Sequence, residues 1–106
     1  MTDIASVYAV FASAEEAAQI GRAAVEERLA ACVNILGPCH SVYRWQGKIE
    51  EADEVAAIFK TRADAAPALI TRIAELHSYE VPAAVVWPIV DALGAYVSWV
   101  EAETGA

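Results

Sequence analysis

The stretch of sequence that decides the fold is residues 31–61, which read ACVNILGPCHSVYRWQGKIEEADEVAAIFKT. Residues that favour strands are frequent on both sides of Gln46-Gly47. A polar residue followed by glycine between two such runs is typical of a β-hairpin turn. A two-residue turn at this point pairs Trp45 with Lys48 and fixes the pairing of every residue behind them.

One feature interrupts the first strand of this predicted hairpin. Counted back from the turn without a slip, the register places Val33 opposite Lys60. Gly37-Pro38 lies in between, and proline cannot donate a hydrogen bond to a neighbouring strand. We therefore expect a bulge or bend there, with the pairing shifted beyond it.

The predicted hairpin is long for a chain of 106 residues. At ~3.3 Å per residue, residues 31–45 alone would span roughly 50 Å if straight. A compact domain of this size has a radius of gyration of ~13 Å and a diameter of about 34 Å. The ribbon must therefore bend sharply or project, and a projecting ribbon would expose Val42, Tyr43, Trp45 and Ile49. Such a surface and its free edges need a partner, most simply another copy of the chain.

Length and charge limit the classes of protein to consider. We expect one domain, residues 1–106, and the formal net charge is −8. Acidic residues are spread along the chain and no basic stripe is present, which argues against nucleic acid and against anionic membranes as partners. No signal peptide or membrane span is recognisable, so a cytoplasmic location is expected. Cys32 and Cys39 would lie ~23 Å apart on an extended strand, and we expect free thiols.

The rest of the chain predicts two split β-α-β units and a final helix. Residues 4–12 favour a strand, and Ser13 with Glu16 forms a capping-box pattern for a helix that ends near Leu29. Pro67 fits the first turn of a second helix, which ends near residues 77–78. A fourth strand over 83–89 and a helix over 94–103 follow. This order predicts an α+β, ferredoxin-like fold, β-α-β-β-α-β plus a C-terminal helix.

Several segments together resemble the CutA, or divalent-cation-tolerance, family. They cover nearly the whole chain in the family's order, and they are residues 26–35 (EERLAACVNI), 41–50 (SVYRWQGKIE), 59–61 (FKT), 77–82 (HSYEVP) and 96–99 (YVSW). The resemblance implies a ferredoxin-like protomer and a homotrimer held by the long hairpins and the end of the fourth strand. It also implies a shape related to the PII signalling proteins and a role in tolerance of copper and other divalent cations.

The chain departs from the family pattern at two places. Gly37-Pro38 reverses the common Pro-Gly order and is followed by Cys39-His40, while the common His-Pro-Tyr is here His77-Ser78-Tyr79. Some copper-binding bacterial members use a cysteine near the end of the first strand and two adjacent histidines. Of that ligand set only His77 is present in this chain.

Three residues are candidate metal ligands: Cys39, His40 and His77. Thiolate and imidazole suit copper and zinc. Because Cys39 and His40 are adjacent on a strand, they point to opposite faces, so a shared metal would require contacts between copies. The alternatives are structural: His40 opposite Asp53 is an ordinary cross-strand pair, and His77 caps a helix C-terminus.

A second group of candidates would line a cleft between subunits: Tyr43, Trp45, Glu50, Lys60 and Tyr79. The alternatives are again structural. Tyr43 and Trp45 would pack between subunits, and Lys60 would form an ion pair with Glu50 or Glu54.

Nothing in the sequence indicates an enzyme. Two histidines and two cysteines without close spacing give neither a catalytic triad nor a closed metal motif, and no glycine-rich phosphate loop occurs. No organic cofactor is expected. The first hypothesis is a cytosolic homotrimer that acts in the response to metal ions, with copper or another divalent cation as its ligand. The alternatives are a PII-like sensor that binds a small metabolite or a partner protein at inter-subunit clefts, and a structural trimer without a ligand.

Overall fold

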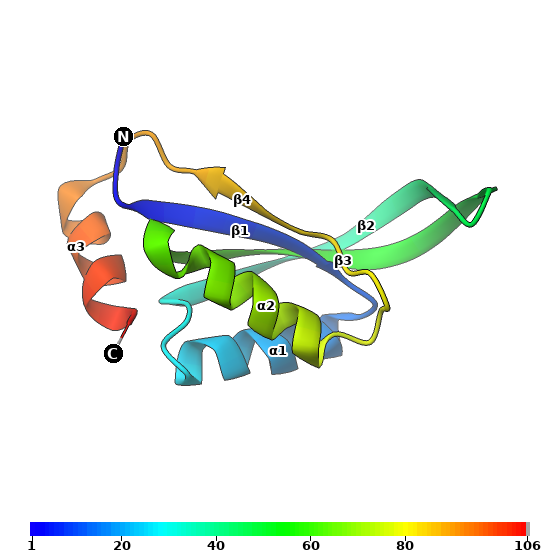
Figure 1. Ribbon diagram of the computed structural model, residues 1–106, viewed down its shortest axis with the longest axis horizontal. Helices are drawn as coiled ribbons and strands as arrows, with labels where there is room; N and C mark the ends of the chain where they lie inside the picture. The colour runs from blue at the N-terminus through cyan, green and yellow to red at the C-terminus, as the bar shows by residue number, and fades with distance from the viewer. Residues whose placement is uncertain (106) are drawn as a thin grey trace.

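The computed structural model describes residues 1–105 and consists of one sheet with helices on one face and at one end. In chain order the elements are β1 (Ile4–Phe11), α1 (Ala14–Glu26), β2 (Cys32–Trp45), β3 (Lys48–Arg62), a 3-10 turn (Ala63–Ala65), α2 (Ala66–Leu76), β4 (Ala84–Pro88) and α3 (Gly94–Glu103). All strand pairs are antiparallel, and the sheet order is β2-β3-β1-β4. The α+β class and the element order expected from the sequence are confirmed (Figure 1).

The core lies between the sheet and helices α1 and α2. Alternate residues of β1 and β3 face the helices and are fully buried, as strand geometry requires: Val7, Ala9 and Phe11 from β1, and Ala57 and Phe59 from β3. The helices meet them with apolar residues at helical spacing, chiefly Ala17, Ile20, Leu69 and Ile73. The intervening residues of β1 and β3 lie on the opposite face, which neither of these helices covers (Figure 1).

Helix α1 begins as predicted and ends earlier than predicted. The Ser13 hydroxyl accepts a hydrogen bond from the Glu16 amide, as an N-cap does. The helix stops at Glu26 rather than near Leu29, because Arg28 adopts a left-handed conformation with φ of 61°. That conformation ends a helix and turns the chain toward β2. The Arg28 side chain then donates to the Ala102 carbonyl at the C-terminal end of α3, which fixes α3 to this corner.

The β2–β3 hairpin has the turn and the bulge predicted from the sequence. Gln46 and Gly47 both have positive φ, 50° and 80°, as a two-residue turn of this kind requires. The register holds from Trp45↔Lys48 back to Gly37↔Ala56, and then shifts by one residue so that Ile35 pairs with Ala57. Leu36 is the extra residue, and Gly37 has φ of 101° beside it. Val33 therefore lies opposite Phe59 and not opposite Lys60.

The hairpin projects from the domain, as its length predicted. The molecule measures 44 Å along its longest axis and 26 and 22 Å across, and Figure 1 shows the outer half of the hairpin extending beyond the helices. The apolar side chains of this half remain exposed, with Val42 and Ile49 each 62% accessible.

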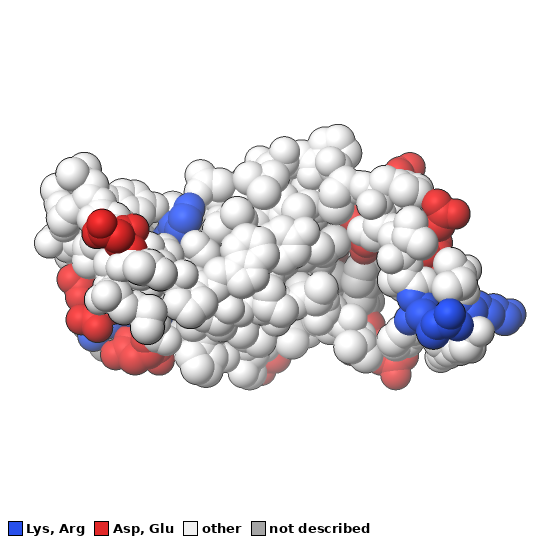
Figure 2. Space-filling model, turned by 90° about the horizontal axis from the view of Figure 1, so that it is seen from above, with Lys and Arg blue, Asp and Glu red and all other residues white. Residues whose placement is uncertain are grey.

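The sheet face opposite the helices is also apolar over its middle. Figure 2 shows this face with charged atoms gathered toward the two ends of the molecule. Tyr8 and Trp87 stack here with ring centroids 4.8 Å apart, and Val85 and Trp87 are each 46% exposed. A contiguous apolar face of this kind is typical of an interaction surface.

Close packing between α1 and β2 gives a stability prediction. A Cβ atom at Gly21 would lie 2.6 Å from Val33 Cγ1, whereas one at Gly94, also helical, would meet nothing within 4 Å. Gly21→Ala should lower the free energy of unfolding by about 1 kcal/mol, because overpacking outweighs the gain in helix propensity. Gly94→Ala should leave it unchanged or raise it slightly. Urea denaturation of the three proteins measures both, and equal effects of the two substitutions would contradict the packing described here.

Candidate functional site

A groove of about 550 Å³ lies at the base of the projecting half-hairpin. Its walls come from β2, β3, the end of β1 and the loop between α2 and β4. Two kinds of side chain dominate the lining, three aromatic rings and three carboxylates: Tyr43, Trp45, Tyr79, Glu50, Glu54 and Glu80. The bulge at Leu36 brings the first two rings to this side, because a one-residue shift reverses the face on which every later side chain of β2 lies.

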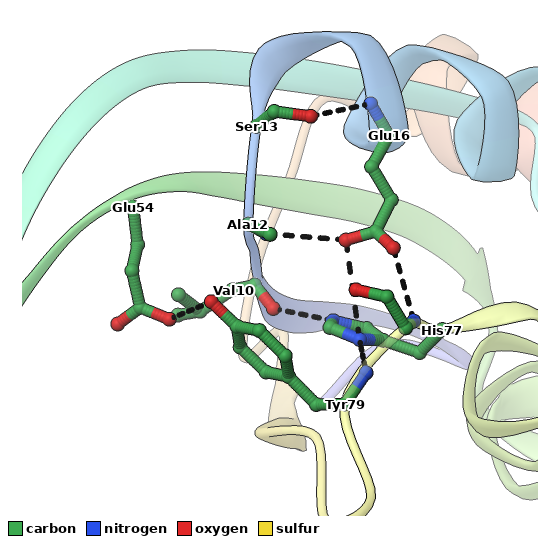
Figure 3. Close-up of polar contacts among 8 residues, drawn as sticks. Val10, Ala12, Ser13, Glu16, Glu54, His77 and Tyr79 are labelled. Carbon is green, nitrogen blue, oxygen red and sulfur yellow. Dashed lines mark hydrogen bonds and ion pairs between the residues drawn. The ribbon is translucent and has the colours of Figure 1, made fainter.

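Glu54 and Tyr79 form the inner wall of the groove. Glu54 is only 8% exposed, and its Oε2 accepts a 2.7 Å hydrogen bond from the Tyr79 hydroxyl (Figure 3). Burial, followed by this hydrogen bond and the carboxylate charge, raises the pKa of Tyr79 well above its usual range. Tyr79 therefore remains a protonated donor, and it presents its ring to the groove while its hydroxyl is held by Glu54.

His77 anchors the loop that carries Tyr79. Its Nε2 lies 2.7 Å from the Val10 carbonyl, which can only accept, and its Nδ1 lies 3.0 Å from the Tyr79 amide, which can only donate. These partners assign the neutral tautomer with the proton on Nε2. The ring is fully covered and stacks on Phe11 at 5.1 Å. A metal at His77 would have to displace one of these two hydrogen bonds.

Glu16 ties the same loop to the start of α1. Its Oε1 accepts from the Ala12 amide at 3.1 Å and its Oε2 from the Ser78 amide at 3.0 Å (Figure 3). Partial burial alone would raise the pKa of Glu16. The hydrogen bonds from the Ser78 side chain and from the Ala12 and Ser78 amides outweigh it, and the pKa is lowered. One carboxylate thus fixes the end of β1 and the loop after α2 relative to each other.

Cys39 and His40 lie on the outer hairpin and have separate surroundings. His40 Nε2 is 2.7 Å from Glu51 Oε1, and His40 Nδ1 is 2.9 Å from Asp53 Oδ1. These hydrogen bonds raise the pKa of His40, and the one with Glu51 has the larger effect. The cross-strand pair with Asp53 considered from the sequence is therefore present. Cys39 Sγ lies 4.0 Å from the Ser41 hydroxyl, and both cysteines are free thiols. Within residues 1–105, no three His, Cys, Asp or Glu side chains are grouped so that they could hold a metal ion.

The structure brings four of the five predicted cleft residues together and separates the fifth. Tyr43, Trp45, Glu50 and Tyr79 all line the groove. Lys60 lies toward the far end of β3, where its Nζ donates to the Asn34 side chain at 2.9 Å. The ion pair of Lys60 with Glu50 or Glu54 considered from the sequence was wrong, because these groups lie far apart along β3.

Sequence reasoning missed Glu54 and Glu80 as groove residues. The spacing of Glu50 and Glu54 along β3 places both on one face of the strand, which was a usable signal. The burial of Glu54 could not be predicted from the sequence, because it depends on the loop after α2, which brings Tyr79 to Glu54.

Comparison with known proteins places the chain in a family. The model of the CutA1 divalent ion tolerance protein matches residues 5–103. The chain belongs to the CutA1 family. The divalent-cation tolerance protein CutA of Thermus thermophilus is 45% identical over 93 residues, which cover 88% of this chain and 90% of that protein. The resemblance stated from the sequence is confirmed.

Other family members agree in fold and differ in length. The crystal structure of CutA from Xylella fastidiosa superposes with a TM-score of 0.94 at 38% identity, covering 98% of this chain and 100% of that one. The structure of an Archaeoglobus fulgidus member described as a periplasmic divalent cation tolerance protein gives a TM-score of 0.91 at 36% identity over 94% of this chain and 97% of that one. Protein CutA of Mus musculus is 42% identical over 83% of this chain, which spans half of that protein's length.

No helix within residues 1–105 is long and apolar enough to cross a membrane.

The contacts of Glu16 give a prediction on pH dependence. Because the pKa of Glu16 is lower in the folded chain than its ordinary value of 4.5, its contribution to stability is present above that value and is lost as the pH falls through the folded pKa. Glu16→Gln should therefore lower the free energy of unfolding by about 1–2 kcal/mol at pH 7, with a smaller difference at pH 3.

The matched control is Glu15→Gln, in the same first turn of α1. It removes the same charge from the same end of the helix without touching the loop after α2. Urea denaturation at the two pH values measures all three proteins, and equal losses for the two variants at pH 7 would show that the Glu16 contacts do not stabilise the fold.

Proposed function

We propose that this chain acts in the tolerance of divalent cations as a cytoplasmic homotrimer of ferredoxin-like protomers. Membership of the divalent ion tolerance family over residues 5–103 carries the proposal. The strand order β2-β3-β1-β4 with both long helices on one face supports the ferredoxin-like assignment. The net charge of −8 and the scattered acidic residues support a role that does not involve nucleic acid or anionic membranes.

The exposed apolar surface supports the homotrimer. Edge strand β2 is 14 residues long, and its outer half, with the facing part of β3, leaves Val42 and Ile49 largely exposed. The sheet face opposite the helices adds Val85 and Trp87. A long edge and an apolar face on one molecule are surfaces that association would cover.

Copper is our candidate metal, with Cys39 and His40 as candidate ligands. Cys39 is a half-buried free thiol on the exposed hairpin, and a thiolate is a ligand that copper prefers. Since His40 points to the other side of β2, the proposal requires Cys39 residues of several copies to approach one another, or a ligand from a second copy. His77 is the weakest of the three candidates because both of its ring nitrogens are engaged.

A second candidate function is a PII-like sensor that binds a small molecule without direct metal chemistry. The groove of about 550 Å³ favours it, since its volume lies in the range of small-molecule sites and it combines aromatic walls with a few polar groups. In this function, tolerance of metal ions would be an indirect consequence of ligand binding.

Copper titration separates these two functions. We expect Cu(I) to bind the wild-type protein, and Cys39→Ser to weaken the binding at least about tenfold, because it removes the thiolate. Cys32→Ser is the matched control, since Cys32 is the other free thiol and lies at the opposite end of β2 beside the Tyr96 hydroxyl.

The readout is competition with a chromophoric Cu(I) chelator at fixed pH, repeated with Zn(II). Wild-type binding no tighter than that of an unrelated acidic protein, or equal losses in the two cysteine variants, would exclude direct copper chemistry at Cys39. The sensor function and the structural trimer without a ligand would then remain.

A further inference from the structure

We propose that the groove beside the hairpin binds an organic cation, a compound with one or more ammonium groups such as a diamine or polyamine. The carboxylates would hold the charged nitrogen, and the aromatic rings would cover its faces and its carbon chain. The inference deepens the second candidate function and rests on it; it does not require the protein to bind a metal.

The charge of the groove is the first argument. Glu50, Glu54 and Glu80 line it, and its lining over the described residues includes no Lys, Arg or His. Glu54 is more than nine-tenths buried, accepts one hydrogen bond from Tyr79, and has no ion pair within residues 1–105. Figure 3 shows its second oxygen without a partner among the residues drawn. A buried carboxylate without a compensating cation is costly, so this site favours a positively charged occupant.

The rings are the second argument, and it does not depend on the first. Tyr43, Trp45 and Tyr79 line the same groove and remain 40%, 37% and 36% exposed. The negative face of an aromatic ring attracts a cation, and cages of such rings are a common device for recognising ammonium groups. Tyr79 is held by its hydroxyl and its neighbour His77, whose ring centroid is 4.7 Å away, so its ring is fixed before any ligand arrives.

The same features argue against the other classes of ligand. A nucleotide or an organic acid would place its negative charge against three carboxylates. An inorganic divalent cation requires several closely grouped ligands, and the described residues provide no group of three. An organic ammonium compound needs no such coordination shell, and its carbon chain gains from contact with the apolar walls.

A second copy of the chain is the rival occupant. Arg44 and Lys48 flank the hairpin turn, and Figure 2 shows basic atoms gathered at the hairpin end of the molecule. Neither residue has an ion-pair partner within the described part of the chain. We favour the small cation because the groove, at about 550 Å³, is much larger than one guanidinium group. The experiment below treats the hairpin tip as one of its outcomes.

The test is isothermal titration with putrescine and spermidine at 0.15 M salt, where weak attraction to an acidic surface is largely screened. Tetramethylammonium probes the rings alone, and citrate is the anionic comparison. Glu54→Gln keeps the shape and removes the buried charge, and Trp45→Leu removes one ring. Glu51→Gln is the matched control, because it removes the same charge from an exposed position on the opposite side of β3.

We expect spermidine to bind the wild-type protein and the Glu51→Gln variant with equal affinity. Its affinity for the Glu54→Gln and Trp45→Leu variants should be about tenfold lower. Equal weakening by Glu51→Gln and Glu54→Gln would overturn the inference, since binding would then follow net charge alone. Binding of citrate without binding of the amines would overturn it while leaving the sensor function in place.

Absence of binding by every probe would also overturn the inference. In that case the variant Arg44→Ala/Lys48→Ala identifies the rival: recovery of spermidine binding in this variant would show that the hairpin tip of another copy occupies the groove.

Discussion

The rest of the structure depends on the register of the β2–β3 pairing. The turn at Gln46-Gly47 fixes it at one end, and the bulge at Leu36 shifts it by one residue. Before the bulge, Val33 lies opposite Phe59 and packs against the core. After it, Tyr43 lies opposite Glu50 on the groove side. Because of one extra residue in β2, the same strand packs side chains against the core at one end and lines the groove at the other.

A second constraint gives the groove its inner wall. The loop after α2 must fold back over β3 for Tyr79 to reach Glu54, and two side chains hold it there. His77 binds the Val10 carbonyl from within the loop, and Glu16 binds the Ser78 amide from α1. Both are polar groups used inside the fold, so they contribute to the site by positioning the loop and not by facing a ligand.

The sequence predicted the elements that local chemistry determines. The turn, the bulge near Gly37, the N-cap at Ser13 and the position of α3 all agree with the structure. The end of α1 was placed too late, because a left-handed arginine has no signature in sequence. Arg28 adopts this conformation, and its side chain contacts the end of α3, far away along the chain.

The candidate site was also predicted only in part, because some of its residues come together through contacts between distant segments of the chain. Tyr43, Trp45 and Glu50 share one face of the hairpin, which the alternation of side chains along a strand makes predictable, whereas Tyr79 reaches the groove from the loop after α2. Lys60 lies away from the groove of the single chain, since distance along β3 separates them, and its place in a cleft between subunits stays a prediction. The metal ligands proposed at Cys39 and His40 stay a prediction, because they depend on contacts between copies of the chain.

The central claim is that the outer half of the hairpin is an assembly surface, and the mass of the protein in solution tests it most directly. Sedimentation equilibrium at micromolar concentration should give three times the protomer mass of 11.3 kDa. A mass of 11.3 kDa under the same conditions would contradict the account, because a lone chain would then leave its long edge and its apolar face in water.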